Sequence, residues 1–233
     1  MAPDNDEALV LPLWINGHVY LTMVESFFNV TNPKTGEVLR RTPLCGLDAA
    51  TKAVAVARAA LPQWGLCSED ERKSPLLKIA DALEVYAAHF AALIVAETGK
   101  DASGAAAEVA QAVSLLRAAS AQSQLAGSVL VAINDDTMPL FGLLSIAVPA
   151  LLAGAVIVAK PSPKAPSAAF AFAELTARAG LPDGVFNIVQ GDIEAIEGLC
   201  ASPAVSILLF AGDAALGARV GEIATRHGKL FVA

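Results

Sequence analysis

Short extended runs separated by turn residues make up the first part of the chain. The segment 13–19 (LWINGHV) carries Asn-Gly between strand-forming residues, which predicts a β-hairpin. In 27–44 (FFNVTNPKTGEVLRRTPL), Asn-Pro and Thr-Gly stand between two extended runs. This segment predicts a second hairpin.

From residue 48 the apolar positions recur with the period of a helix. Three helices are predicted, over 49–64, 69–98 and 105–122. We expect Asp48 to cap the first helix, Ser68 to cap the second, and Gly99 to end the second.

Strands and helices then alternate to the end of the sequence. Strands are predicted at 128–133, 155–160, 185–191, 205–212 and 229–233, with helices at 138–154, 167–180, 192–203 and 214–228. Alternation with short connections is typical of a parallel sheet covered on both faces. The prediction is an α/β fold over residues 1–233 as a single domain. It has a Rossmann-like parallel sheet with helices on both faces, preceded by hairpins and helices at the N-terminus, and its ligands should bind at the carboxyl ends of the strands.

One uncharged run of 22 residues, 138–159, is long enough to cross a membrane. Pro139, Pro149 and Gly154 interrupt it, and β-branched residues follow at 156–158. A short helix, a turn and a buried strand explain the run better, so no membrane segment is expected.

Charge, hydrophobic content and cysteine spacing limit the kinds of binding partner and the location expected for this protein. The 16 basic and 23 acidic residues give a net charge of -7 without a dense basic block, which argues against nucleic acid. A hydrophobic content of 55% is high for a soluble monomer and favours a protein partner or a homo-oligomer. Three cysteines without CxxC spacing argue against disulfides and a zinc site, and the acidic N-terminus lacks a secretion signal, so a cytoplasmic location and no metal are expected.

Six motifs follow one another in an order that resembles the aldehyde dehydrogenase superfamily. They are WING, TNPKTGEVL, ETGK, AGAVIVAKPS, GLPDGVFNIVQGD and FAGDAALG. Together they cover nearly the whole chain and are similar to the N-terminal, NAD-binding portion of that superfamily.

The resemblance implies a set of cofactor contacts. The KPS lysine of the family binds the adenosine ribose, and the FTGS turn holds the pyrophosphate through backbone N–H groups at a helix N-terminus. Carried onto this sequence, the candidate residues are Lys160, Ser162, Gly191, Gly212, Asp213 and Gly217. The alternative is that Lys160 is an ordinary strand-end lysine and that the glycines serve turns only.

Three departures from the family pattern bear on chemistry. Asp213 replaces a serine at the phosphate turn, and Pro163 replaces the glutamate that takes a ribose hydroxyl. Thr137 replaces the asparagine that helps to hold the oxyanion. Binding of NAD or NADP is therefore expected to be weak or lost. The neighbouring Asn134, Asp135 or Asp136 is expected to cap the next helix rather than bind a metal.

The catalytic groups of the family have no counterpart here. Its general base and nucleophilic cysteine follow later motifs, so no catalytic residue is assigned and the catalytic domain is expected to be absent. The family's oligomerisation hairpin is also missing between Ala121 and Gly127. The stretch DDTMPL resembles that of noncatalytic aldehyde-dehydrogenase-like modules.

Three hypotheses follow for function. The first is a noncatalytic module, a pseudoenzyme, that acts through self-association or a partner enzyme. The second is the NAD(P)-binding part of an aldehyde oxidoreductase whose catalytic Cys and Glu come from another chain. The third is a shortened product of a gene whose other half carried the chemistry.

Overall fold

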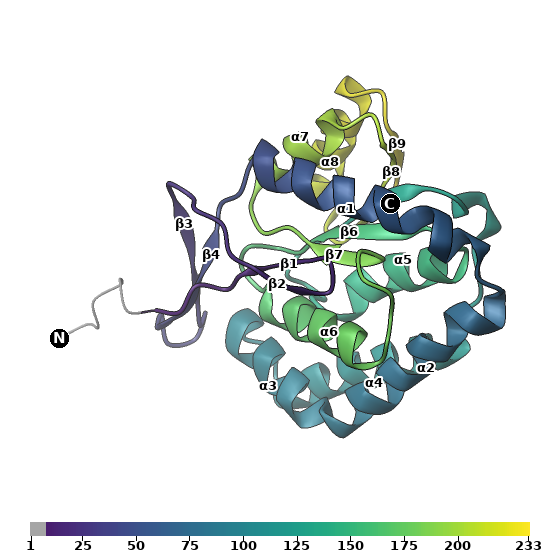
Figure 1. Ribbon diagram of the computed structural model, residues 1–233. Helices are drawn as coiled ribbons and strands as arrows, with labels where there is room; N and C mark the ends of the chain where they lie inside the picture. Colours follow the sequence, from purple (N-terminus) through teal and green to yellow (C-terminus); the bar gives the residue numbers. More distant parts are fainter. Residues whose placement is uncertain (1–7) are drawn as a thin grey trace.

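A seven-stranded sheet lies between two layers of helices in the computed structural model, which describes residues 8–233 (Figure 1). The strand order is β2-β1-β7-β6-β5-β8-β9, and the five strands from β7 to β9 are parallel. The strands are β1 (Leu13–Ile15), β2 (His18–Tyr20), β5 (Val129–Asn134), β6 (Val156–Lys160), β7 (Phe186–Ile188), β8 (Val205–Ala211) and β9 (Leu230–Val232). This arrangement confirms the predicted α/β fold.

Both predicted hairpins are present. Strands β1 and β2 join at Asn16 and Gly17, whose φ values of 60° and 77° suit the tight turn that Asn-Gly favours. Strand β1 also pairs antiparallel with β7, which extends the sheet. Strands β3 (Phe27–Thr31) and β4 (Val38–Pro43) form a separate antiparallel pair.

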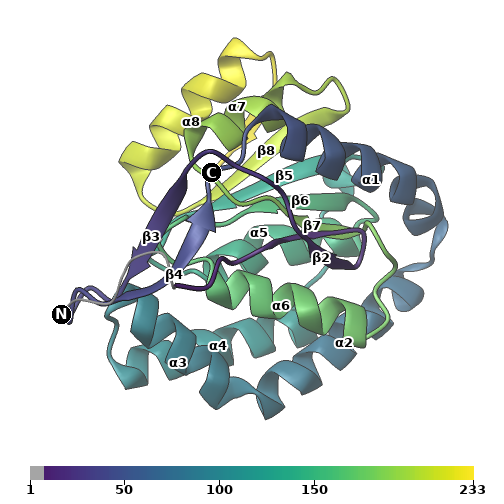
Figure 2. The ribbon, with the colours of Figure 1, turned by 60° about the vertical axis from the view of Figure 1, so that its left-hand side comes forward.

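Helices cover both faces of the sheet, as predicted. One face carries α1 (Leu47–Leu66), α7 (Ile193–Ala201) and α8 (Ala214–Arg226) (Figure 2). The other carries α5 (Phe141–Leu152) and α6 (Ser167–Arg178). Outside α5 and α6 lies a further layer made of α2 (Glu69–Val85), α3 (Ala87–Thr98) and α4 (Ala102–Ala118).

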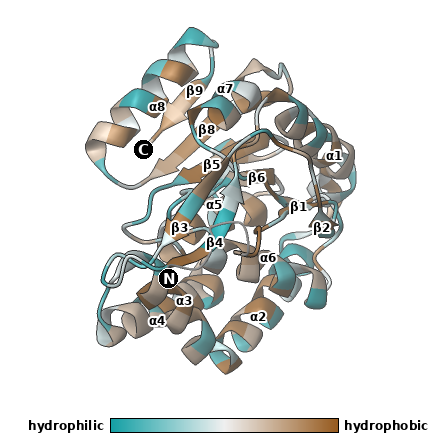
Figure 3. Cartoon of the chain, turned by 90° about the vertical axis from the view of Figure 1, so that its left-hand side faces the viewer, coloured by the Kyte–Doolittle hydropathy of each residue, from teal (hydrophilic) through white to brown (hydrophobic). Residues whose placement is uncertain are grey.

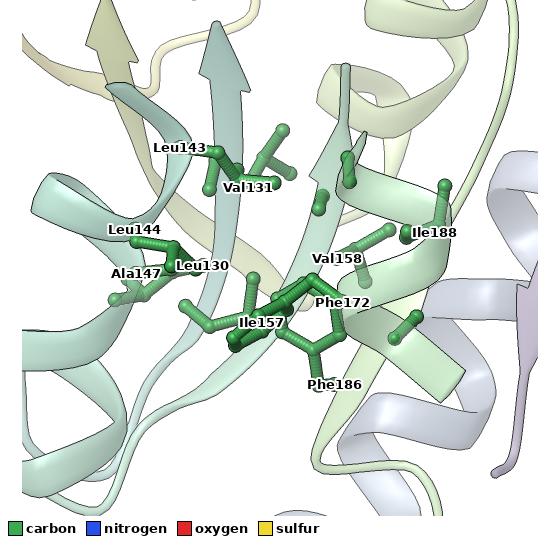
Figure 4. Packing of buried hydrophobic residues seen from close by; sticks show 14 of the residues in the cluster. Leu130, Val131, Leu143, Leu144, Ala147, Ile157, Val158, Phe172, Phe186 and Ile188 are labelled. Carbon is green, nitrogen blue, oxygen red and sulfur yellow. The ribbon is translucent and has the colours of Figure 1, made fainter. Parts of the chain in front are cut away.

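The core fills both faces of the sheet, and one part of it lies between the sheet and α5 and α6. Leu130 and Ile157 are fully buried, and the rings of Phe172 and Phe186 meet edge to face with centroids 5.4 Å apart (Figure 4). Every residue of β5 and β6 is buried, which explains their unbroken apolar sequence. Hydrophobic residues continue along β8 and β9 (Figure 3).

The uncharged run 138–159 forms α5, a turn at Gly154 and the buried strand β6, which confirms the sequence-based interpretation. In the described part of the chain no one helix combines the length and apolarity that crossing a membrane requires. Helices α2 and α3 reach those limits only when taken together, and they are bent by 73° where they meet.

Three predictions about helix ends need correction. Helix α1 begins at Leu47 with Gly46 before it, so Asp48 lies in the first turn and caps nothing. The predicted helix 69–98 is two helices that break at Tyr86. None of Asn134, Asp135 and Asp136 caps α5, because Glu108 of α4 accepts the N–H groups of Leu140 (2.9 Å) and Phe141 (3.2 Å) instead.

Other helix signals are confirmed. Ser68 caps α2 in a reciprocal arrangement with Glu71, and Gly99 ends α3 with a φ of 71°. Between α4 and β5 the structure has a single short 3₁₀ turn, η1 (Ser123–Leu125).

Candidate functional site

The strand order places a topological switch between β5 and β8. From β5 the chain passes through α5 to β6, which lies on one side of the β5–β8 pair. From β8 it passes through α8 to β9, which lies on the other side of that pair, and α5 and α8 cover opposite faces of the sheet (Figure 2). Open α/β sheets bind ligands in the crevice that such divergence leaves at the carboxyl ends of the strands. The segments 134–137 and 211–213 stand at this place.

Lys160 is the last residue of β6, one strand from the switch. Its side chain is buried, with 4% of the residue exposed, and no hydrogen bond or ion pair joins it to another residue among 8–233. Burial lowers the pKa of this ammonium to about 8, although the charge of Asp192 opposes that change. A buried, unpaired ammonium at a strand end is a group available to a ligand.

Ser162 already has partners within the chain. Its hydroxyl donates to Asp136 Oδ1 (3.2 Å) and accepts from the N–H of Lys164 (3.3 Å). The carbonyl of Pro163 accepts a hydrogen bond from the hydroxyl of Thr42 (3.1 Å), which ties this loop to β4. The loop after β6 is therefore held by internal contacts.

Gly212 and Asp213 connect β8 to α8. Asp213 is the N-cap of α8, and its Oδ1 accepts the N–H groups of Ala215 (2.9 Å) and Leu216 (3.2 Å). The N–H of Asp213 donates to Oδ2 of Asp135 (2.6 Å). A Cβ added to Gly212 would lie 2.4 Å from Cγ of Asp135, so only glycine fits there. The phosphate turn that the resemblance implied is thus lined by two carboxylates.

The two remaining candidate glycines have packing partners of their own. A Cβ on Gly191 would come within 2.9 Å of the carbonyl of Cys45, and one on Gly217 within 3.1 Å of the ring of Phe210. Packing requires glycine at position 191, where φ is 141°, whereas at position 217 the Phe210 ring would have to shift by a few tenths of an ångström. Neither residue type is therefore evidence of a cofactor. Their contact with a cofactor stays a prediction.

Thr137 is exposed, and its polar groups are bonded within the chain. Its hydroxyl and its N–H both donate to Asp135 Oδ1, at 2.5 and 2.9 Å, and its carbonyl accepts from Lys100 Nζ (3.0 Å). Lys100 also pairs with Glu108 (2.5 Å), the residue that caps α5. This network fixes the loop that carries Asp135.

None of the three cysteines stands at the switch point. Cys45 lies between β4 and α1 and Cys200 lies in α7, and burial raises the pKa of each thiol to about 11. The thiol of Cys67 donates to the carbonyl of Gln63 (3.4 Å) at the end of α1.

Sequence reasoning missed Glu108 and gave Asp135 a capping role that the structure does not show. Glu108 falls on the buried stripe of α4 with Ala112 and Leu116, four and eight residues later, and a charged residue on an apolar stripe is a usable signal. Asp135 gave no such signal, because its partner Asp213 is 78 residues away.

Comparison with known proteins identifies the family. The model of the aldehyde dehydrogenase family matches residues 21–141 and 129–233, and the chain belongs to that family. A vanillin dehydrogenase of Pseudomonas sp. (strain HR199 / DSM 7063) is 31% identical over 94% of the chain and 50% of the relative. The structure of lactaldehyde dehydrogenase from Escherichia coli superposes with a TM-score of 0.86 at 29% identity, over 96% of this chain and 51% of that one.

A Sinorhizobium meliloti protein of the same fold was solved in complex with NAD. It superposes with a TM-score of 0.88 over 96% of this chain and 50% of that one, at 22% identity, which supports the fold alone. The chain spans about half the length of the curated relatives it matches.

Proposed function

We propose that these 233 residues form a noncatalytic aldehyde-dehydrogenase-like module that acts by association, with a second copy or with a complete enzyme. The observation that carries this proposal is the chemistry of the strand ends. The switch point holds two carboxylates and a threonine, with a lysine one strand away, whereas aldehyde oxidation in this family needs a thiolate nucleophile and a base. Cys45 and Cys200 have raised pKa values and lie inside the protein, which makes them unsuited to that step.

The edge strand β9 supports an associating role. Within residues 8–233 it pairs on one side only, with β8, and its Leu230 and Val232 are 59% and 46% exposed. An open sheet edge that carries apolar side chains is a template for pairing with another chain. We place the contact surface at this edge.

Light scattering on the purified chain tests the association with a second copy. We expect a mass above that of the monomer and a return to the monomer for Leu230→Lys with Val232→Lys, because a lysine pair cannot be buried in a dry interface without cost. Leu66→Lys is the matched control, since Leu66 is 88% exposed at the end of α1 and far along the chain from β9. A monomer at all concentrations excludes self-association.

A complete enzyme as the partner needs its own measurement. Mixing the chain with a purified aldehyde dehydrogenase should give a complex by light scattering that the double lysine variant does not form. Reduction of NAD+ by the purified chain alone, given an aldehyde, would contradict the noncatalytic assignment.

A second candidate function has one observation in its favour. The unpaired, buried ammonium of Lys160 suits a ligand hydroxyl, as in the NAD(P)-binding part of an aldehyde oxidoreductase whose cysteine and glutamate come from another chain. A calorimetric titration with NAD+ and NADP+ separates the two functions. Saturable binding favours the second, whereas weak or lost binding is what the replacements at Asp213 and Pro163 lead us to expect.

A further inference from the structure

The entrance to α8 is where this fold would hold a ligand diphosphate. Helix α8 begins directly after β8, at the switch point, and the first N–H groups of a helix have no partner within the helix. They point toward the crevice at the positive end of the helix dipole. Dinucleotides in such sheets place their diphosphate against these groups.

In this chain carboxylates already accept those donors. Asp213 takes the N–H groups of Ala215 and Leu216, and Asp135, arriving from β5, takes the N–H of Asp213. The two side chains therefore bring two negative charges to the place where a diphosphate would bring its own.

The Asp135 carboxylate is fixed in this position. The residue is 5% exposed, its Oδ1 accepts two hydrogen bonds from Thr137, and its Oδ2 accepts one from Asp213. It lies so close to Gly212 that a Cβ there would overlap it. The carboxylate cannot move aside for a ligand without losing all three hydrogen bonds at once.

We propose that Asp135 and Asp213 act as an internal substitute for the ligand diphosphate and make this chain reject dinucleotides at the switch point. Lys160 fits the ribose end of a dinucleotide, but the residues at the diphosphate end do not fit. A diphosphate would have to displace bonded carboxylates and then lie beside their charges. Asp135 is buried and Asp213 is exposed, so the repulsion from Asp135 is the less screened of the two. Asp135 and Asp213 are thus specificity determinants, and this inference does not depend on the association role of β9.

Restored binding in variants tests the proposal. Isothermal titration with ADP, NAD+ and adenosine is run on wild type, Asp213→Ser, Asp135→Asn and the double variant. Serine keeps an N-cap acceptor for the donors of α8, whereas asparagine keeps the side-chain shape and one acceptor oxygen, which can serve either Thr137 or the N–H of Asp213. We expect no saturable binding of ADP or NAD+ by wild type and a gain of about tenfold or more in affinity for both in the variants. Adenosine, which lacks phosphate, should show no gain.

Asp136→Asn is the matched control. It removes one charge from the same loop, but Asp136 bonds Ser162 and not the entrance of α8. An equal gain in this control, or a gain that includes adenosine, would overturn the assignment, and so would wild type that binds ADP as tightly as the variants. Thermal melting establishes that each variant is folded, and Asp213→Ser alone decides the matter if the double variant does not fold. The titrations measure ligand binding, whereas light scattering measures association through β9. A failed titration result therefore leaves the association role standing, and the reverse holds as well.

Discussion

Replacing Lys160 by methionine should stabilise the protein at neutral pH. The charged ammonium is buried without a partner, and methionine fills a similar elongated volume without a charge. A pKa of about 8 in place of the ordinary 10.5 corresponds to about 3 kcal/mol of unfolding free energy. That figure is the largest gain we expect from Lys160→Met.

The effect of pH has a definite sign. Because the pKa of Lys160 is lower in the folded than in the unfolded protein, the folded state releases this proton first, and wild-type stability rises between about pH 8 and about pH 10.5. The advantage of the methionine variant is therefore greatest below pH 8 and shrinks as the pH rises through that window.

Urea unfolding at about pH 7 and about pH 10 measures this difference. Lys164→Met serves as the control, because Lys164 is exposed four residues away and should change stability little at either pH. If the unfolding free energies of wild type and Lys160→Met stayed parallel across this range, the reasoning about an unpaired buried charge would be refuted. A stabilised variant would also indicate that Lys160 is kept for a purpose other than folding.

Two further predictions concern buried glutamates. Glu108→Ala should destabilise the protein by about 3 kcal/mol, because Lys100 loses its ion pair and two N–H groups at the start of α5 lose their acceptor. Glu108→Gln keeps an acceptor and should lose less stability. Thermal melts that rank the two variants alike would contradict the capping role. Burial raises the pKa of Glu97, although the hydrogen bonds from Ser167 and the charge of Arg40 oppose the change. The folded protein therefore holds this proton more tightly than the unfolded chain, and wild type should lose stability relative to Glu97→Gln as the pH rises through the raised pKa. Urea unfolding from acid to neutral pH would show it, and the reverse trend would count against it.

The order of elements could be predicted from the sequence because each is encoded locally. The unbroken apolar runs of β5 and β6, the Asn16-Gly17 turn and the cap at Ser68 each depend on neighbouring residues. The end of α5 could not be predicted in this way. Its N-terminus has local candidates such as Asp135, but the acceptor that reaches it lies on α4, 32 residues earlier in the chain.

The candidate site shows the same limit. The resemblance placed Lys160 and Asp213 at strand ends, and the structure finds them there. Whether either residue contacts a cofactor stays a prediction. The contact between Asp135 and Asp213 depends on the pairing of β5 with β8, which no local pattern encodes. Likewise the break at Tyr86 lies within one continuous helical pattern, and α2 and α3 both pack against α4 and α6, contacts that no local pattern encodes.

Glu97 and Glu108 serve the same purpose at two places. Glu97, at the end of α3, accepts the N–H and hydroxyl of Ser167 at the start of α6, just as Glu108 of α4 does for α5. The outer helices thus complete the hydrogen bonding of the inner ones. If α3 and α4 unfolded first, the N-terminal N–H groups of α5 and α6 would lose their hydrogen-bond acceptors. The two layers should therefore unfold together as one cooperative unit.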